Sequence, residues 1–260
     1  MKNPTPDLKS IPPLVMVAHG SRREEARHSI DRLRDLVVAI RPGLQVFASY
    51  IELCDPLFPS ILRELSQSAI IVPLLLTHGF HLATDVRAVA YENGFETSEP
   101  LGPDSKLIDL LNLRLKQAGT PDDASIILAA AGSKDKASNK DVELVAQALS
   151  RLRGVTVKVG FIGSAMPNFF EVARKIQDRN IAVSPYLLSP GKFSESLANC
   201  GMPWIAEPLG IHQLIAQLIL DRYDHTVRCA GITTTSMSAT KTTAIQHGSI
   251  KLATPNFIFR

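Results

Sequence analysis

Short apolar runs and longer amphipathic stretches alternate along the chain. Four apolar runs in the first half predict strands, at residues 14–18, 44–51, 69–76 and 95–98. The stretches that follow them carry apolar residues at helical spacing and predict helices, at residues 23–40, 57–67, 83–92 and 104–117. Strands that alternate with helices in this way form a parallel sheet with right-handed crossovers.

The same pattern occurs a second time further along the chain. Gly20-Ser21 follows the first apolar run and recurs as Gly132-Ser133, together with the apolar face of the next helix. The tetrapeptide EPLG stands before a predicted helix at both 99–102 and 207–210. Several matching blocks in the same order indicate a duplication. We therefore expect an α/β protein of two tandem flavodoxin-like three-layer units, each with a parallel four-stranded sheet.

Composition sets the boundaries of these units. Glycine, proline and acidic residues cluster at 117–125, so the first unit is predicted at 14–119 and its degenerate repeat at 120–224. Residues 1–13 are expected to form a flexible leader. Residues 225–260 are rich in Thr and Ser and lack acidic residues, and they predict a mobile or loosely packed tail.

Charge and cysteine content narrow the class of protein. The chain of 260 residues is 45% hydrophobic and 20% charged, and its net charge of +3 gives no indication of a nucleic-acid or membrane partner. Its three cysteines have no disulfide or metal-ligand spacing. The leader lacks the apolar core of a signal peptide, and no apolar run is long enough to span a bilayer. We expect a cytoplasmic protein.

Candidate chemistry stands at the ends of three strands in the first copy. His19 follows the first strand, Glu52 the second, and His78 and His81 the third. Ligands of open parallel sheets bind beyond the carboxyl ends of the strands, so these groups are expected to meet there. Imidazoles with a carboxylate suit a divalent transition metal, and a carboxylate also accepts protons.

The second copy serves as an internal control for these residues. It keeps the scaffold but replaces every candidate ligand, since the corresponding positions are Ala131, Gly163, Pro190 and Phe193. Residues required only by the fold would be needed in both copies. The difference predicts one functional site in the first unit and a supporting role for the second.

Ser21 admits two interpretations. It could be a nucleophile, but the G-x-S-x-G elbow of hydrolases is absent. A helix N-cap with Glu24 three residues later explains it better, and Ser133 repeats the cap in the second copy. Nucleotide-binding glycine motifs are also absent.

These residues carry a family resemblance. The segments LVMVAHGSRREEA, SYIELCDPLFPSIL and VPLLLTHGFHLATDV resemble the class II chelatases of tetrapyrrole synthesis, the sirohydrochlorin cobaltochelatases and ferrochelatases. The resemblance implies a chelatase-like fold, with His19 and His81 as the metal-binding pair and Glu52 as the third catalytic residue. One departure is Arg87, where the family pattern has a proline two residues after Asp85.

The resemblance also implies an activity, which is insertion of Fe²⁺ or Co²⁺ into sirohydrochlorin for sirohaem or cobalamin synthesis. The metal would be a substrate, with no permanently bound cofactor, and the partners would be sirohydrochlorin and the ion. Neither nucleic acid nor a membrane is expected to bind, and the two fused units predict a monomer.

The resemblance leaves the groups that bind the macrocycle less defined. Ser21, Arg22, Arg23 and His78 are the candidate substrate-binding residues. The arginines lie close to His19 and could pair with the carboxylates of the substrate. They could equally be solvated residues of the first helix, and Arg27 is open to the same two interpretations. Lys192 in the second copy is a further candidate for the acidic rim of the ring.

Two alternatives to a chelatase stay open. A carrier would bind metal or tetrapyrrole without turnover, and a hydrolase would use Ser21. The sequence does not choose between iron and cobalt, because both metals share the same ligand types.

Overall fold

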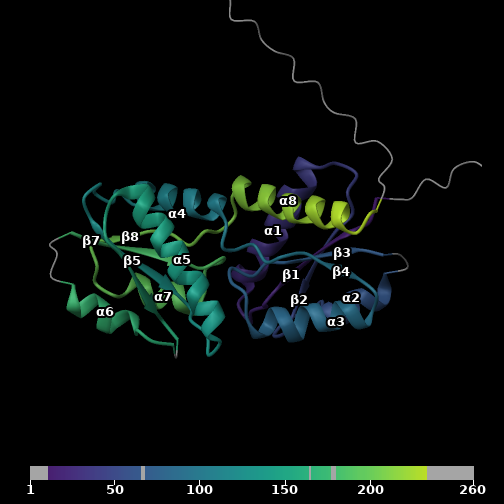
Figure 1. The fold of residues 1–260 in the computed structure, drawn as a ribbon, viewed down its shortest axis with the longest axis horizontal. Helices are drawn as coiled ribbons and strands as arrows, with labels where there is room; N and C mark the ends of the chain where they lie inside the picture. The colour runs from purple at the N-terminus through teal and green to yellow at the C-terminus, as the bar shows by residue number, and fades with distance from the viewer. Residues whose placement is uncertain (1–10, 66–67, 164, 177–179, 233–260) are drawn as a thin grey trace, which may run out of the picture.

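Two four-stranded parallel sheets lie side by side in the computed structural model, which describes residues 11–65, 68–163, 165–176 and 180–232 (Figure 1). The first sheet has the order β2-β1-β3-β4, with β1 Leu14–Ala18, β2 Val46–Tyr50, β3 Ile70–Pro73 and β4 Glu96–Thr97. The second has the order β6-β5-β7-β8, with β5 Ser125–Ala130, β6 Val157–Phe161, β7 Ile181–Tyr186 and β8 Trp204–Ile205. Every pairing in both sheets is parallel, which confirms the predicted fold class.

Helices follow the strands as predicted. In the first half they are α1 Glu24–Ile40, α2 Phe58–Glu64, η1 His81–Ala88, α3 Val89–Glu92 and α4 Ser105–Gln117. In the second half they are α5 Lys136–Arg153, α6 Phe169–Lys175, α7 Lys192–Ala198 and α8 Gln213–Cys229. The helix predicted at 83–92 begins two residues earlier, at His81, and η1 consists of wider π-helical turns, which are frequent at functional sites.

Burial explains why these segments adopt these elements. All five residues of β1 and all six of β5 are buried, so both strands are covered on two faces. The buried positions of α1 fall on one stripe, Ala26, Ile30, Leu33 and Val37. The buried stripe of α5 includes Val142, Val145 and Leu149, the counterparts of three of these positions.

Buried apolar side chains form three hydrophobic clusters. One cluster joins the facing helices α1, α4, α5 and α8 to one face of both sheets and is continuous across the two units. The opposite face of the first sheet packs against α2, η1 and α3, and that of the second packs against α6 and α7. Both units therefore have the predicted three-layer arrangement.

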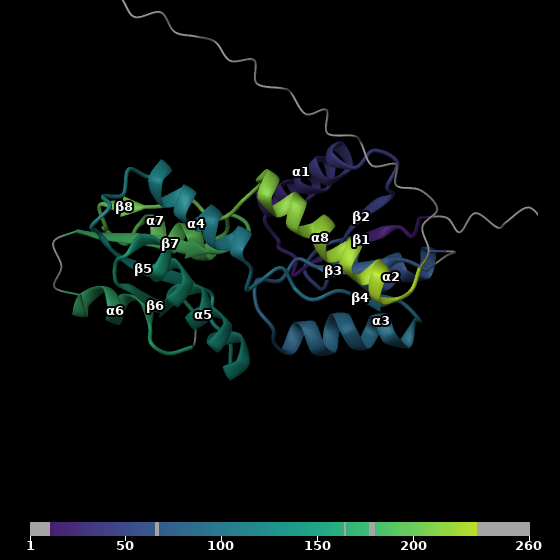
Figure 2. The ribbon, with the colours of Figure 1, turned by 45° about the horizontal axis from the view of Figure 1, so that its top comes forward.

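The last helix of each half covers the sheet of the other half (Figure 2). Helix α4 packs against β7 and α5, whereas α8 packs against β3 and α1. Polar contacts fix the exchange, since Arg41 Nη2 donates to Asp224 Oδ2 at 2.7 Å and Arg114 Nη2 donates to the Leu209 carbonyl at 2.8 Å. The division between residues 119 and 120 thus separates the two sequence repeats. In the folded chain, however, α4 packs on the sheet of the second repeat and α8 on the sheet of the first.

The boundary predicted for the tail is placed too early. Helix α8 continues to Cys229, and Thr226 and Val227 are buried in it. The hydroxyl of Tyr223 donates to the carbonyl of Pro12 at 2.6 Å, so the end of the predicted leader is also packed. The remaining residues of both segments, 1–10 and 233–260, lie outside the described part of the chain. Within the described residues, no helix has the length and apolar character needed to cross a membrane.

Candidate functional site

The turn after β1 places His19 beside the loop that carries Glu52. Gly20 has a φ of +101°, and a Cβ there would lie 1.8 Å from the carbonyl oxygen of Glu52. Only glycine fits this backbone and this close approach. The Glu52 amide donates to the His19 carbonyl at 3.1 Å, and His19 Nε2 lies 3.4 Å from Glu52 Oε1. The first two predicted groups are therefore adjacent.

The first residue of η1 supplies the second imidazole. The ring centroids of His81 and His19 lie 4.8 Å apart, with 57° between the ring planes. His81 Nδ1 and Asp85 Oδ2 are 2.6 Å apart, and Thr84 donates to the other oxygen of this carboxylate at 3.1 Å. A proton on Nδ1 that is shared with Asp85 leaves the lone pair of Nε2 available. His19 and His81 thus converge as predicted.

Electrostatics favour a neutral His19. Burial lowers its pKa from the ordinary 6.5, and the neighbouring His81 lowers it further, against the opposing effects of Glu52 and Asp85. The side chains of His19, Glu52 and His81 are still about half exposed, at 47%, 51% and 49%. A neutral imidazole that reaches solvent has the lone pair needed to bind a metal ion.

The histidine pair lies in a cleft between the two units. A cavity of about 900 Å³ is lined by His19, Phe80 and His81 on one side and by Lys134 and Phe193 on the other. A second cavity of about 290 Å³ also contains His19 and Phe193 and reaches Ser21 and Arg27. Among the described residues, no group of three or more His, Cys, Asp or Glu is arranged to hold a metal ion. The cleft therefore offers two imidazoles, with one carboxylate next to His19.

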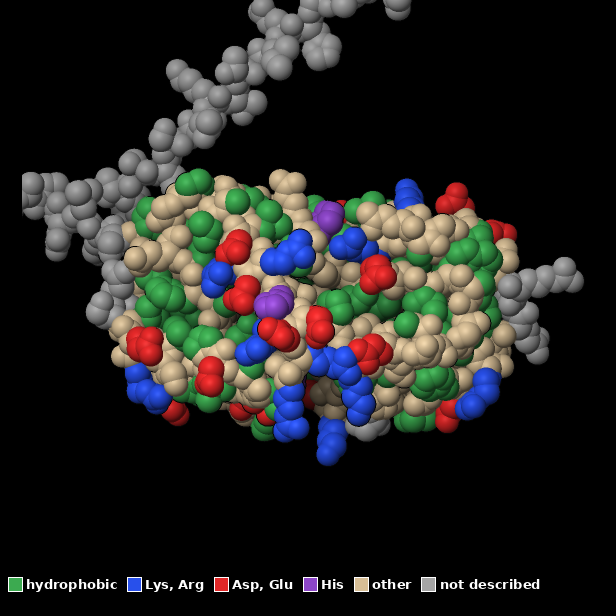
Figure 3. All heavy atoms as spheres, turned by 180° about the vertical axis from the view of Figure 1, so that it is seen from behind, with side chains coloured by type: hydrophobic (Ala, Val, Ile, Leu, Met, Phe, Trp, Pro, Cys, Tyr) green, Lys and Arg blue, Asp and Glu red, His purple; other side chains and the backbone are tan. Residues whose placement is uncertain are grey.

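The junction of the units is strongly charged. In the face shown in Figure 3, histidine, acidic and basic side chains gather near the middle of the molecule, between hydrophobic areas on either side. Arg23, which precedes α1, forms an ion pair with Glu195 of α7 and so links the two units near the cleft. Arg22 is exposed beside it, and Lys192 is exposed at the first turn of α7.

Ser21 is not the N-cap predicted for α1. The helix begins at Glu24 with Arg23 at its N-cap, and no side chain caps it. The Ser21 hydroxyl instead accepts a hydrogen bond from the Arg23 amide at 3.1 Å, within the turn. Ser133 accepts from the Asp135 amide at 3.0 Å in the same way, and there Asp135 is the N-cap. The recurrence is real, but the serine stabilises the turn before the cap.

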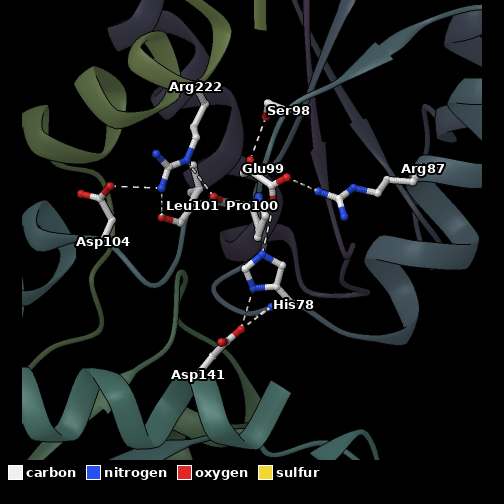
Figure 4. A network of polar contacts seen from close by, with 9 residues as sticks. All are labelled: His78, Arg87, Ser98, Glu99, Pro100, Leu101, Asp104, Asp141 and Arg222. Carbon is white, nitrogen blue, oxygen red and sulfur yellow. Dashed lines mark hydrogen bonds and ion pairs between the residues drawn. The ribbon is translucent and has the colours of Figure 1, made fainter. Parts of the chain in front are cut away.

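His78 has partners that the sequence did not reveal (Figure 4). Its Nδ1 lies 2.8 Å from Asp141 Oδ2 on α5, and its Nε2 lies 3.1 Å from Glu99 Oε2. Glu99 also pairs with Arg87 at 2.8 Å. Burial alone would lower the pKa of His78, but the hydrogen bonds to Asp141 and Glu99 outweigh it and raise the pKa. The ring thus connects the two units, and a role in substrate binding stays a prediction.

The second unit reproduces the backbone of the site without its ligands. The Gly163 amide donates to the Ala131 carbonyl at 2.9 Å, as the Glu52 amide does to His19. Sequence reasoning named Asp85 only as part of the family pattern and gave it no role, whereas the structure places it against His81. Its spacing of four residues from His81 on a helix was the available signal.

Comparison with known proteins shows the family of the chain. The CbiX family model matches residues 13–118 and 125–226. The sirohydrochlorin ferrochelatase of Priestia megaterium is 26% identical over 247 residues, which cover 84% of this chain and 91% of that protein. The sirohydrochlorin cobaltochelatase of Methanopyrus kandleri is 27% identical over 77 residues, which cover 28% of this chain and 54% of that protein.

The fold has a close structural neighbour in SirB from Bacillus subtilis with Fe³⁺. The two superpose with a TM-score of 0.71 at 22% identity, and the match covers 85% of this chain and 97% of that one. The family match extends over both halves of the chain, which supports the duplication inferred from the repeated motifs. The chain therefore belongs to the CbiX family of class II chelatases, in the form with two repeated units.

Proposed function

We propose that this protein is a metal chelatase that inserts Fe²⁺ or Co²⁺ into sirohydrochlorin. The observation that carries the proposal is the convergence of His19 and His81, with ring centroids 4.8 Å apart, in a cleft that also holds Glu52 near His19. Membership of the CbiX family and the activities named for its sirohydrochlorin chelatase relatives support it.

The chemistry follows from these three side chains. A divalent ion that enters the macrocycle displaces two pyrrole N–H protons, which must be removed. His19, kept neutral by its lowered pKa, and His81, oriented by Asp85, hold the ion over the ring. Glu52, on the His19 side, accepts the two displaced protons one after the other and releases each to solvent.

The metal leaves within the product, so it is a substrate and no resident cofactor is proposed. Imidazole and carboxylate ligands suit both iron and cobalt, and supply in the cell would decide between them. Sirohydrochlorin and the ion are the proposed partners. We propose that the protein acts as a monomer, because the second unit already completes the cleft. We also propose that it acts in the cytoplasm, without nucleic acid or a membrane.

Basic groups at the mouth of the cleft would meet the carboxylates of the macrocycle. Arg22 is exposed three residues after His19, and Arg23 can exchange Glu195 for a substrate carboxylate. The Ser21 hydroxyl lines the smaller cavity, and His78 lines the larger one. We assign these four residues to substrate binding.

Initial rates of metal insertion test the proposal. The protein should accelerate the reaction of sirohydrochlorin with Fe²⁺ or Co²⁺ over the spontaneous rate. His19→Ala and His81→Ala should each lower the rate by about 100-fold, because each removes one of the two metal ligands. His28→Ala is the matched control and should leave the rate unchanged, because His28 is an exposed residue of α1 that pairs with Glu24.

Two results would contradict the proposal. The first is the absence of acceleration with either metal, and tight binding without acceleration would identify a carrier instead. The second is a His19→Ala variant that is as fast as the unaltered chain. Retained activity in Ser21→Ala would separately dismiss a hydrolase-type nucleophile.

A further inference from the structure

The second unit has converted its copy of the site into an apolar surface. Three of its positions correspond to the functional triad of the first unit, and they are Ala131, Gly163 and Phe193. These positions still meet in space. The Gly163 amide donates to the Ala131 carbonyl at 2.9 Å, and a Cβ at Gly163 would lie 4.0 Å from Cζ of Phe193. Where the first unit has its functional groups, the second has an aromatic ring beside the half-buried residues Ala131 and Gly163.

Phe193 faces the same space as the histidine pair. It lines both cavities of the cleft, and His19 lines both as well. Phe193 as a residue is 38% exposed, although a phenylalanine side chain gains free energy from burial. The smaller cavity has mostly apolar neighbours around this ring, including Leu187, Leu188 and Pro190. An exposed aromatic ring in an apolar part of a cleft suits a flat, conjugated ligand.

We propose that Phe193 stacks against one face of the tetrapyrrole, opposite the face to which His19 and His81 deliver the metal. This assignment rests on the proposed function. Aromatic rings prefer offset stacking, which would fix the macrocycle parallel to Phe193 and hold its other face toward the imidazoles. The inference makes the degenerate unit the binding platform for the macrocycle.

The replacement of all three functional groups also has a chemical reason. A second pair of imidazoles in the second unit would compete for the ion and could hold it on the wrong face of the ring. Ala131 and Gly163 present no ligand atom on their side chains, and the carbon ring of Phe193 presents none either. Metal delivery is therefore confined to one face.

Equilibrium binding of metal-free sirohydrochlorin tests this inference without turnover. Its absorbance or fluorescence would be titrated with protein. Phe193→Ala should raise the Kd by about tenfold through loss of stacking and apolar contact. Phe193→Trp should keep the Kd within about twofold, since it keeps an aromatic face. Co²⁺ binding in the absence of the macrocycle should be the same in both variants and in the unaltered chain.

Phe170→Ala is the matched control. Phe170 is 39% exposed, almost the same as Phe193, but lies on α6 outside both cavities of the cleft. Equal affinities of the unaltered chain and Phe193→Ala would overturn this inference and leave the proposed function standing. Failure of the unaltered chain to bind sirohydrochlorin would overturn both.

Discussion

The two units share a backbone and differ in chemistry at the same three positions. In the first unit the turn after β1 and the loop after β2 carry His19 and Glu52, and in the second they carry Ala131 and Gly163. The hydrogen bond between turn and loop is present in both, at 3.1 Å and 2.9 Å. The scaffold therefore does not require the functional side chains. We propose that the reaction accounts for their presence in one unit, whereas the fold accounts for the glycines of the turns.

Substitution of the turn glycines should have the largest effect on the free energy of unfolding. Gly20→Ala should lower the free energy of unfolding by about 4 kcal/mol, because it combines a left-handed φ with a clash against the Glu52 carbonyl. Gly132→Ala should cost about 3 kcal/mol, because its φ is also positive and its Cβ would lie 2.8 Å from Cβ of Ala165 and 3.0 Å from Cβ of Phe161, a smaller overlap than the one at Gly20. Urea unfolding measures both values.

Gly43→Ala measures the cost of a positive φ in the absence of a steric clash. Gly43 has a φ of +88° with no atom within 4 Å of a Cβ, so its loss should cost only about 1 kcal/mol. If Gly20→Ala were no more destabilising than Gly43→Ala, the close approach of the Glu52 loop would not constrain the turn.

Substitution of Glu52 tests whether its carboxylate has a chemical or a structural role. Glu52→Gln keeps the shape of the side chain and removes its ability to accept a proton. The turnover rate should fall by about 100-fold, with the affinity for metal-free sirohydrochlorin unchanged. Glu143→Gln, on the exposed side of α5, is the control. A rate that Glu52→Gln leaves intact would assign proton acceptance to another group.

Two histidines that line the same cavity should have pKa values shifted in opposite directions. Burial and His81 lower the pKa of His19, so in the metal-free protein it should protonate below pH 6.5. The hydrogen bonds to Asp141 and Glu99 outweigh burial at His78, so it should protonate above pH 6.5. NMR titration of the imidazole resonances measures both midpoints. Asp141→Asn should move the His78 midpoint down and leave that of His19 in place.

These shifts have opposite consequences for pH dependence. Metal binding needs neutral His19, so it should be lost as the pH falls through a value below 6.5. The stabilisation from charged His78 is fully present below its unfolded-state pKa and is lost as the pH rises through its raised folded value. Unfolding of Asp141→Asn should show a weaker form of this second dependence, because Glu99 still contacts the ring, and an identical pH profile would contradict the assignment.

The ion pair between Arg23 and Glu195 should have the smallest effect on stability. Its side chains are 45% and 55% exposed, so a double-mutant cycle should give a coupling below about 1 kcal/mol. Arg23→Ala should nevertheless weaken sirohydrochlorin binding, whereas Glu195→Ala should not. Equal effects of the two substitutions on binding would indicate that the pair itself, and not the guanidinium, matters to the substrate.

Local patterns predicted most of the fold and the centre of the site. Continuous apolar runs identified β1 and β5, and helical spacing identified α1 and α5, because burial of these faces is encoded in neighbouring residues. His19 and His81 could be paired because the carboxyl ends of adjacent parallel strands share one edge.

The features missed depend on contacts between the units. The apolar stripe of α4 fits either sheet equally well, so the sequence could not show that it covers β7. The polar partners of His78 could not be predicted, because nothing in the sequence indicates that Asp141 lies 2.8 Å from it. The N-cap of α1 was misplaced by two residues because an ST turn and a cap use the same serine chemistry.

The exchange of α4 and α8 bears on the stability of each half of the chain. The last helix of each half covers the sheet of the other half, so removal of either half would expose a face of the remaining sheet to water. Deletion of either half should therefore destabilise the other, so the half without the imidazoles is needed for the stability of the half that carries them.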